Sequence, residues 1–146
     1  MDIAELFDRA VKTEEDAYEF YLKFSKIVKN PAAKDLLKEL ANEELNHKNI
    51  IMKYFSGKYE FSKDIPVLSL LDHLPKKENL DENSELKDVL SHAILREEKE
   101  YKFYDELEKY MTDPKIKEIL EFLKKQERNH KAKLENMYDD IIYSEF

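Results

Sequence analysis

The chain has 146 residues and a formal net charge of −8, and charged residues make up 40% of it, with a single Gly and four Pro. This composition favours one domain of long helices with solvated outer faces over a sheet protein with many turns. The negative charge argues against nucleic acid or an anionic membrane as a partner, and the absence of Cys excludes disulfides, thiol nucleophiles and Cys-ligated metal centres. With neither a signal peptide nor an apolar run long enough to cross a bilayer, we expect a cytoplasmic protein.

The first half of the chain predicts a helical hairpin. Apolar residues recur at spacings of three and four over residues 3–28 and again over residues 31–55, which indicates two helices with one buried stripe each. Asn30 is suited to cap the second helix, and Pro31 is suited to its first helical position. Because the connection is so short, the two helices are expected to lie antiparallel.

The second half predicts another hairpin after a long connection. Residues 56–83 lose the helical period and are long enough to cross from one end of a bundle to the other. Helices are expected over residues 84–111 and 114–142, and Asp113 with Pro114 repeats the earlier turn. Two such hairpins joined by a crossover make an all-α antiparallel four-helix bundle, with residues 1–146 in a single domain.

The two hairpins repeat each other at an offset of 83 residues. The sequence Glu-Leu-Asn-His at 44–47 returns as Glu-Arg-Asn-His at 127–130, and Glu14 returns as Glu97. A single Glu-x-x-His on so charged a helix would usually belong to a solvated face. Here the motif recurs in phase with the apolar stripe and at the same distance from a carboxylate on the preceding helix, which favours a paired set of ligands.

Seven polar residues occupy core positions near the middle of the predicted helices. They are Glu14, Glu44, His47, Glu97, Glu100, Glu127 and His130. Burying so many unpaired carboxylates would be costly, and we expect no Lys or Arg at the same positions to neutralise them. Two divalent cations would do so, because Glu-x-x-His places both side chains on one helix face. Carboxylates with one imidazole per metal suit iron or manganese better than calcium.

Two tyrosines are candidates for supporting such a site. Tyr21 and Tyr104 are repeat mates that lie two turns beyond Glu14 and Glu97, so their hydroxyls could hold ligands in place. The plainer interpretation is that these aromatic residues only fill the core. The duplication itself also has a plainer interpretation, in which the fold is inherited and the metal site is vestigial.

These motifs resemble those of the rubrerythrin-type di-iron domain of the ferritin-like superfamily, over nearly the whole chain. The residues that carry the resemblance are Glu14, Ala17, Tyr21, Glu44, His47, Glu97, Glu100, Glu127 and His130. The resemblance implies a ferritin-like bundle in which the six repeat-related Glu and His residues ligate two iron ions, with manganese or a mixed pair as alternatives. It also implies that Glu100, whose counterpart in the first repeat is Ala17, exchanges with His47 as a ligand when an iron changes its oxidation state.

By the same resemblance, the protein is expected to be an oxidoreductase that reduces hydrogen peroxide in defence against oxidative stress, with Glu100, Tyr21 and Tyr104 as catalytic residues. Rubrerythrins usually carry a Cys-ligated rubredoxin domain, and this chain has no Cys. Electrons would therefore come from a separate donor such as a rubredoxin-like protein. The alternatives are a ferroxidase or iron-handling protein that uses dioxygen, a di-iron enzyme acting on an organic substrate, and a structural bundle with a vestigial site. A homodimer is expected by analogy.

Overall fold

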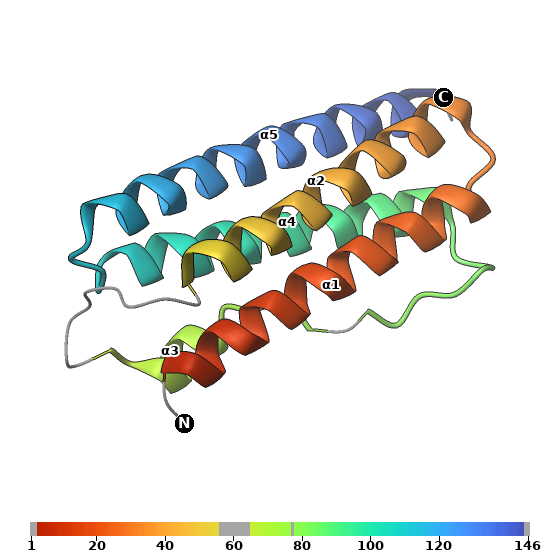
Figure 1. Cartoon of the computed structure of the whole chain (residues 1–146). Coiled ribbons are helices and arrows are strands. Elements are labelled where there is room, and N and C mark those ends of the chain that lie inside the picture. The colour runs from red at the N-terminus through yellow and green to blue at the C-terminus, as the bar shows by residue number, and fades with distance from the viewer. Residues whose placement is uncertain (1–2, 56–64, 77, 145–146) are drawn as a thin grey trace.

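The computed structural model describes residues 3–55, 65–76 and 78–144, and the elements within them are all helices. Their bounds are α1 Ile3–Ile27, α2 Pro31–Phe55, α3 Val67–Leu71, α4 Leu86–Glu108 and α5 Pro114–Ser144. Figure 1 shows the four long helices side by side, with α1 packed on α2 and α4 packed on α5. The all-α four-helix bundle of two hairpins is therefore confirmed. Part of the predicted crossover, residues 56–64 and 77, lies outside the described residues.

The two short turns within the hairpins are closed by the side chains that the sequence suggests. The Asn30 side chain accepts a hydrogen bond of 2.9 Å from the backbone N–H of Ala33. Asp113 accepts from the N–H groups of Lys115 and Ile116, at 2.9 and 3.3 Å. Each side chain satisfies backbone donors that have no partner within the first turn of a helix. The helix-initiating roles of these two residues follow from local chemistry alone.

The helix α4 is shorter than the predicted range 84–111. The Ser84 hydroxyl accepts a hydrogen bond from the N–H of Asp81 and closes a turn instead of starting the helix. At the other end, the N–H groups of Lys109 and Tyr110 bond to carbonyl oxygens three residues back, which tightens the chain out of the α-helical pattern. The adjacent helix α5 ends two residues later than predicted, at Ser144.

A layer of polar residues divides the buried core into two apolar clusters, and each long helix contributes to both. The first cluster includes Phe7, Ile51, Phe103 and Leu120, and the second includes Phe24, Leu37, Leu90 and Leu134. On every long helix, the Glu and His residues of the predicted site lie between these two sets. The crossover helix α3 is anchored to the first cluster by Leu70, which is 1% exposed. Packing on both sides therefore fixes the level of the polar layer.

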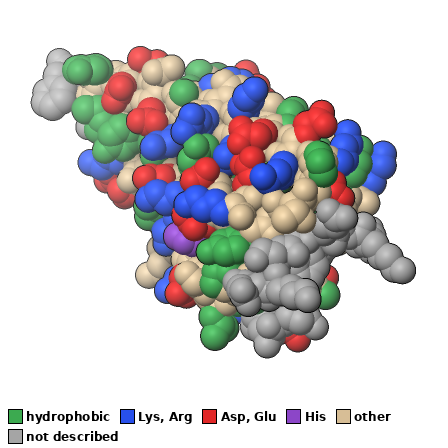
Figure 2. All heavy atoms as spheres, turned by 90° about the vertical axis from the view of Figure 1, so that its left-hand side faces the viewer, with side chains coloured by type: hydrophobic (Ala, Val, Ile, Leu, Met, Phe, Trp, Pro, Cys, Tyr) green, Lys and Arg blue, Asp and Glu red, His purple; other side chains and the backbone are tan. Residues whose placement is uncertain are grey.

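The outer faces of the bundle are charged. Figure 2 shows basic and acidic side chains interleaved over one end of the molecule. Among the described residues, no helix is long and apolar enough to cross a membrane.

Candidate metal centre

The six repeat-related Glu and His residues meet at one level of the bundle. Two overlapping groups of ligand atoms form there, and within each group the atoms lie within 4.8 Å of one another. One group comprises Glu14, Glu44, His47 and Glu127, and the other comprises Glu44, Glu97, Glu127 and His130. All six residues are at most 1% exposed. Because Glu44 and Glu127 belong to both groups, they are placed to bridge two ions, whereas Glu14 and Glu97 each serve one.

The two histidine rings face the carboxylates with the same ring nitrogen. Nδ1 of His47 lies 3.1 Å from Oε1 of Glu127, and Nδ1 of His130 lies 3.4 Å from Oε1 of Glu44. The rings are stacked, with their centroids 5.6 Å apart and their planes at 11°. Each histidine therefore reaches toward a bridging carboxylate of the other hairpin, which is the arrangement expected of one imidazole per ion.

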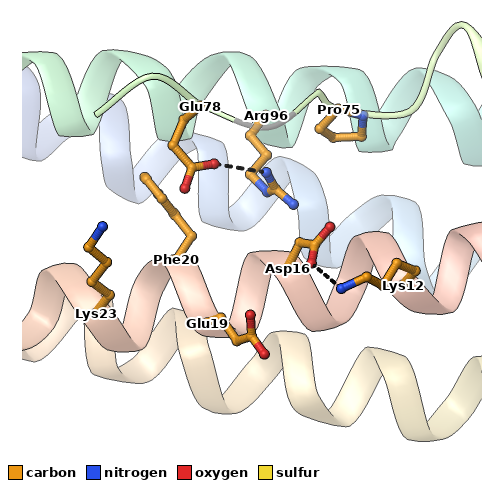
Figure 3. Close-up of a pocket in the computed structure, with 8 residues that line it drawn as sticks. All are labelled: Lys12, Asp16, Glu19, Phe20, Lys23, Pro75, Glu78 and Arg96. Atoms are coloured by element: carbon orange, nitrogen blue, oxygen red, sulfur yellow. Dashed lines mark hydrogen bonds and ion pairs between the residues drawn. The ribbon is translucent and has the colours of Figure 1, made fainter. Parts of the chain in front are cut away.

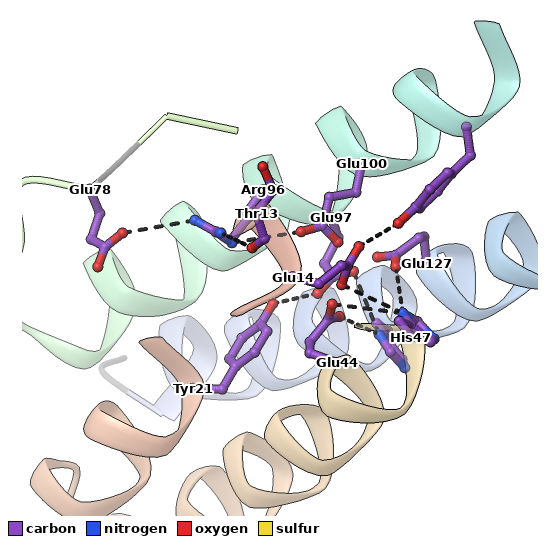
Figure 4. A network of polar contacts seen from close by, with 12 residues as sticks. Thr13, Glu14, Tyr21, Glu44, His47, Glu78, Arg96, Glu97, Glu100 and Glu127 are labelled. Carbon is purple, nitrogen blue, oxygen red and sulfur yellow. Dashed lines mark hydrogen bonds and ion pairs between the residues drawn. The ribbon is translucent and has the colours of Figure 1, made fainter. Parts of the chain in front are cut away.

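Each of the two tyrosine hydroxyls donates a hydrogen bond to a carboxylate of the other hairpin. Tyr21 donates a hydrogen bond of 2.5 Å to Oε1 of Glu97, and Tyr104 donates one of 2.5 Å to Oε1 of Glu14. Burial, followed by the charge of the neighbouring carboxylates, raises the pKa of both phenols well above the usual value. Both hydroxyls therefore stay protonated and act as donors, and each fixes one carboxylate oxygen on the opposite hairpin. Figure 4 labels Tyr21 and draws its hydrogen bond to Glu97.

Glu100 is buried at the same level but belongs to neither group of ligand atoms. Its Oε1 lies 3.8 Å from Nε of Arg96, whose side chain is only 2% exposed. The sequence prediction that no basic side chain would share the buried site is therefore wrong. Arg96 was missed because it precedes Glu97 directly and falls between the apolar positions of the stripe. Arg96 and Glu100 are four residues apart on one helix, and this spacing could have predicted that they share a face and pair.

Sequence reasoning missed a second contact, between His130 and Glu43. Nε2 of His130, which faces away from the carboxylate cluster, contacts Oε2 of Glu43 on α2. Such a carboxylate orients the ring and makes its other nitrogen a stronger ligand. Glu43 directly precedes Glu44, at a position expected on the solvated face of the helix. Its place in the sequence therefore gives little indication of a contact with His130. Its repeat mate is Gln126, an amide.

The pKa values of the clustered side chains differ strongly from those of free side chains. Burial and the charges of Glu100 and Glu97 raise the pKa of Glu44 to about 8. Burial also raises the pKa of Glu127 well above its usual value, with added repulsion from Glu100 and Glu44. Burial would lower the pKa of His130, but its contacts with Glu44 and Glu97 raise it to about 11. The raised pKa values of Glu44 and Glu127 favour the protonated forms of these two carboxyls.

The donor atoms of the cluster fit metal ions. Both oxygens of Glu44, of Glu100 and of Glu127, and Nδ1 of both histidines, are buried without a hydrogen-bond partner among the described residues. Buried polar atoms almost always have such partners, and a group of orphaned atoms calls for an unseen ion or water. Oxygen and imidazole ligands in this number suit two iron or manganese ions. The residues present therefore fit a di-metal carboxylate site.

Two surface pockets reach the neighbourhood of the site. One, of about 360 Å³, lies over α4 and α5; its lining includes Glu97 and Glu127 and the charged residues Glu98, Lys102 and Arg128. The other, of about 450 Å³, lies between α1 and the crossover (Figure 3) and includes Arg96 in its wall. Both linings are strongly charged, which suits small polar solutes better than an apolar organic substrate.

Comparison with known proteins gives a consistent result. The model of the family described as Rubrerythrin matches residues 5–138. A hypothetical protein from Pyrococcus furiosus has a similar structure, with a TM-score of 0.75 and 23% identity over 98% of this chain and 92% of the other. A protein from Thermotoga maritima described as a ferritin-like diiron-carboxylate protein has a TM-score of 0.72 and 24% identity over 95% of each chain. These likenesses confirm a ferritin-like fold. No curated protein sequence matches the chain.

Proposed function

The chain belongs to the rubrerythrin family, and we propose that it is a di-iron oxidoreductase that reduces hydrogen peroxide to water, in defence against oxidative stress. Each turnover would consume one peroxide, two protons and two electrons, and would yield two waters. A separate donor protein would return the electrons. The observation that carries the proposal is the fifth buried carboxylate, Glu100, beside a complete set of six ligands but outside both groups of ligand atoms.

The ligand set divides into roles by its contacts. Glu44 and Glu127 would be shared by the two irons, since each belongs to both groups. Glu14 with His47, and Glu97 with His130, would complete the two coordination spheres. When bound, the irons would supply the two electrons and polarise the peroxide. The hydroxyls of Tyr21 and Tyr104 would hold the outer oxygens of Glu97 and Glu14 and so keep these carboxylates from rotating.

Glu100 would serve as the proton-holding group at the edge of the site. Burial, followed by the charges of Glu14 and Glu97, raises its pKa well above the usual value, while Arg96 lowers it. A carboxyl with a raised pKa can take up a proton and supply it to an oxygen that leaves as water, and in its ionised form Glu100 pairs with Arg96. The charged pocket that reaches Glu97 and Glu127 supports entry of a small polar oxidant rather than a bulky substrate.

The test is stopped-flow oxidation of the anaerobic ferrous protein by peroxide and, separately, by dioxygen. We expect peroxide to oxidise the site faster, and we expect Glu100→Ala to keep two irons per chain yet slow the peroxide reaction at least about tenfold. Glu118→Ala, which removes a carboxylate that is 74% exposed on α5, is the matched control. Equal rates for Glu100→Ala and the unmodified chain would remove the reason for preferring peroxide.

The same measurements separate the other functions. Faster oxidation by dioxygen, with uptake of many more irons than two per chain, would favour an iron-handling protein. A chain that binds no iron after anaerobic reconstitution, and whose melting temperature a chelator leaves unchanged, would be a structural bundle with a vestigial site.

A further inference from the structure

The second hairpin places an ion pair beside the site, and the first hairpin has no equivalent of this pair. Arg96 and Glu100 are four residues apart on α4, and their repeat mates on α1 are Thr13 and Ala17. Arg96 also donates a hydrogen bond of 3.0 Å from Nη2 to the carbonyl oxygen of Thr13, so the two repeat mates meet across the bundle. The carboxylate added in the second repeat is thus accompanied by an added cation.

Arg96 has three partners, which lie in three parts of the fold. Thr13 belongs to α1, Glu100 belongs to α4, and Glu78 lies in the crossover with its carboxylate 3.9 Å from Nη1 (Figure 4). The contact with Thr13 is a well-formed hydrogen bond, whereas those with the two carboxylates are ion pairs longer than hydrogen bonds. The guanidinium is therefore fixed by α1, and the two carboxylates share its charge.

Glu100 contacts this cation and also lies near the carboxylates of Glu14, Glu97 and Glu127. Neither of its oxygens, nor Nε of Arg96, has a hydrogen-bond partner among the described residues. A buried carboxylate held only by charge at 3.8 Å can turn toward a stronger cation at little cost. Divalent ions held by the six ligands would compete with Arg96 for it. Glu78 is 15% exposed and, with Arg96, lines the pocket of Figure 3, so it acts from the solvent side.

We propose that Arg96 is a positioning residue that holds Glu100 away from the two metal ions, and that Glu78 of the crossover weakens this hold by drawing on the same guanidinium. The inference rests on the two-metal site of the proposed function, and it does not depend on whether peroxide is the oxidant. Arginine suits the role because its planar fork addresses three acceptors at once, whereas a lysine ammonium is a single point of charge.

The test is a cobalt(II) titration of the full chain, followed by the visible absorption of the bound ion. Removing the guanidinium should free Glu100 to become a ligand. In Arg96→Gln we therefore expect the weaker of the two cobalt sites to bind about tenfold more tightly. Its absorption should also fall, because an added carboxylate raises the coordination number. In a Glu100→Gln background, the same substitution should change the affinity less than about twofold.

Two further variants separate positioning from simple charge. Arg96→Lys keeps the charge but loses the three-way contact, so it should resemble Arg96→Gln. Glu78→Gln leaves Glu100 as the only carboxylate that pairs with Arg96, and should weaken the second cobalt site about threefold, a shift of opposite sign. The metal-free melting temperature of each variant is measured first. If Arg96→Gln does not fold, Glu78→Gln is measured instead, in the unmodified chain and in Glu100→Gln. The same double-mutant comparison then applies, with an expected change in cobalt affinity of opposite sign.

Each outcome supports or overturns the inference. An equal effect of Arg96→Gln with and without the Glu100 carboxylate, or wild-type affinity in Arg96→Lys, would show that Arg96 acts only through its charge. A Glu78→Gln shift in the same direction as Arg96→Gln would overturn the role of the crossover. Failure of the unmodified chain to bind a second cobalt would overturn the proposed function as well, which distinguishes that result from failure of this inference alone.

Discussion

In the first hairpin, burial and the charge of Glu44 raise the pKa of Glu14 well above its usual value, and burial lowers the pKa of His47. In the second hairpin, burial opposes ionisation too, but close contacts with Glu127 and His130 lower the pKa of Glu97 to about 2, and the pKa of His130 is raised to about 11. Without metal, the first hairpin thus presents a neutral acid and a neutral imidazole, and the second presents an ion pair.

The repeats also diverge at a few positions near the site. Those that bear on the site are Thr13 and Arg96, Ala17 and Glu100, and Glu43 and Gln126. Residues that are identical in both hairpins build the ligand frame and donate the tyrosine hydrogen bonds to it, whereas residues that differ add the contact of Arg96 with Glu100 and that of Glu43 with His130. A duplicated fold can therefore present two ion positions that are alike in ligands and unlike in chemistry. The following predictions test that comparison.

The largest effect is expected from the carboxylates that both hairpins share. Glu44→Ala and Glu127→Ala should each lose both metal ions, because each residue belongs to both ligand groups, whereas His47→Ala should lose one. Metal content per chain, measured by plasma mass spectrometry after ferrous reconstitution, reports this directly. Retention of one full equivalent in Glu44→Ala would show that the carboxylate is not shared, and that the two positions are independent.

The metal-free protein should lose several kcal/mol of stability as pH rises from 5 to 8. The folded pKa of Glu44 is about 8, so the folded chain keeps a proton that the unfolded chain releases above about 4.5, and folding weakens across that window. His130, with a pKa of about 11, adds a change of the same sign above about 6.5, whereas Glu97, with a pKa of about 2, acts only below the window.

Urea unfolding at pH 5, 6, 7 and 8 measures this dependence. Metal should reverse it, since ions displace the protons and bind more tightly as pH rises. Greater stability of the metal-free chain at pH 8 than at pH 5 would mean that the cluster does not hold these protons, and would remove the difference in charge between the hairpins.

The smallest effect is expected from the carboxylate behind one histidine. Glu43→Gln replaces the carboxylate beside His130 with an amide, the group that Gln126 carries at the equivalent position of the second repeat. It should weaken one of two cobalt sites about tenfold. Gln126→Asn is the matched control, because it shortens an amide and adds no charge. Equal weakening of both sites would show that the contact acts on the bundle as a whole rather than on the His130 position.

Much of this protein is determined by its sequence alone. The 3.6-residue period fixes which face of each helix is buried, and the Asn30-Pro31 and Asp113-Pro114 turns fix two antiparallel hairpins. Because an i, i+3 pair always shares a helix face, Glu-x-x-His in two apolar stripes was enough to predict that carboxylates and imidazoles converge. Those inferences need only local geometry and the cost of burying unpaired charge.

The tertiary structure decided how the two hairpins act on each other. Helical periodicity places a residue on a face but does not say which atom of the opposite hairpin it meets. The crossed bonds from Tyr21 and Tyr104, the contact of Glu43 with His130, and the burial of Arg96 against Thr13 and Glu100 all join residues far apart in the chain. Such contacts depend on the rotation and offset of packed helices, which are set by the apolar clusters on either side of the polar layer.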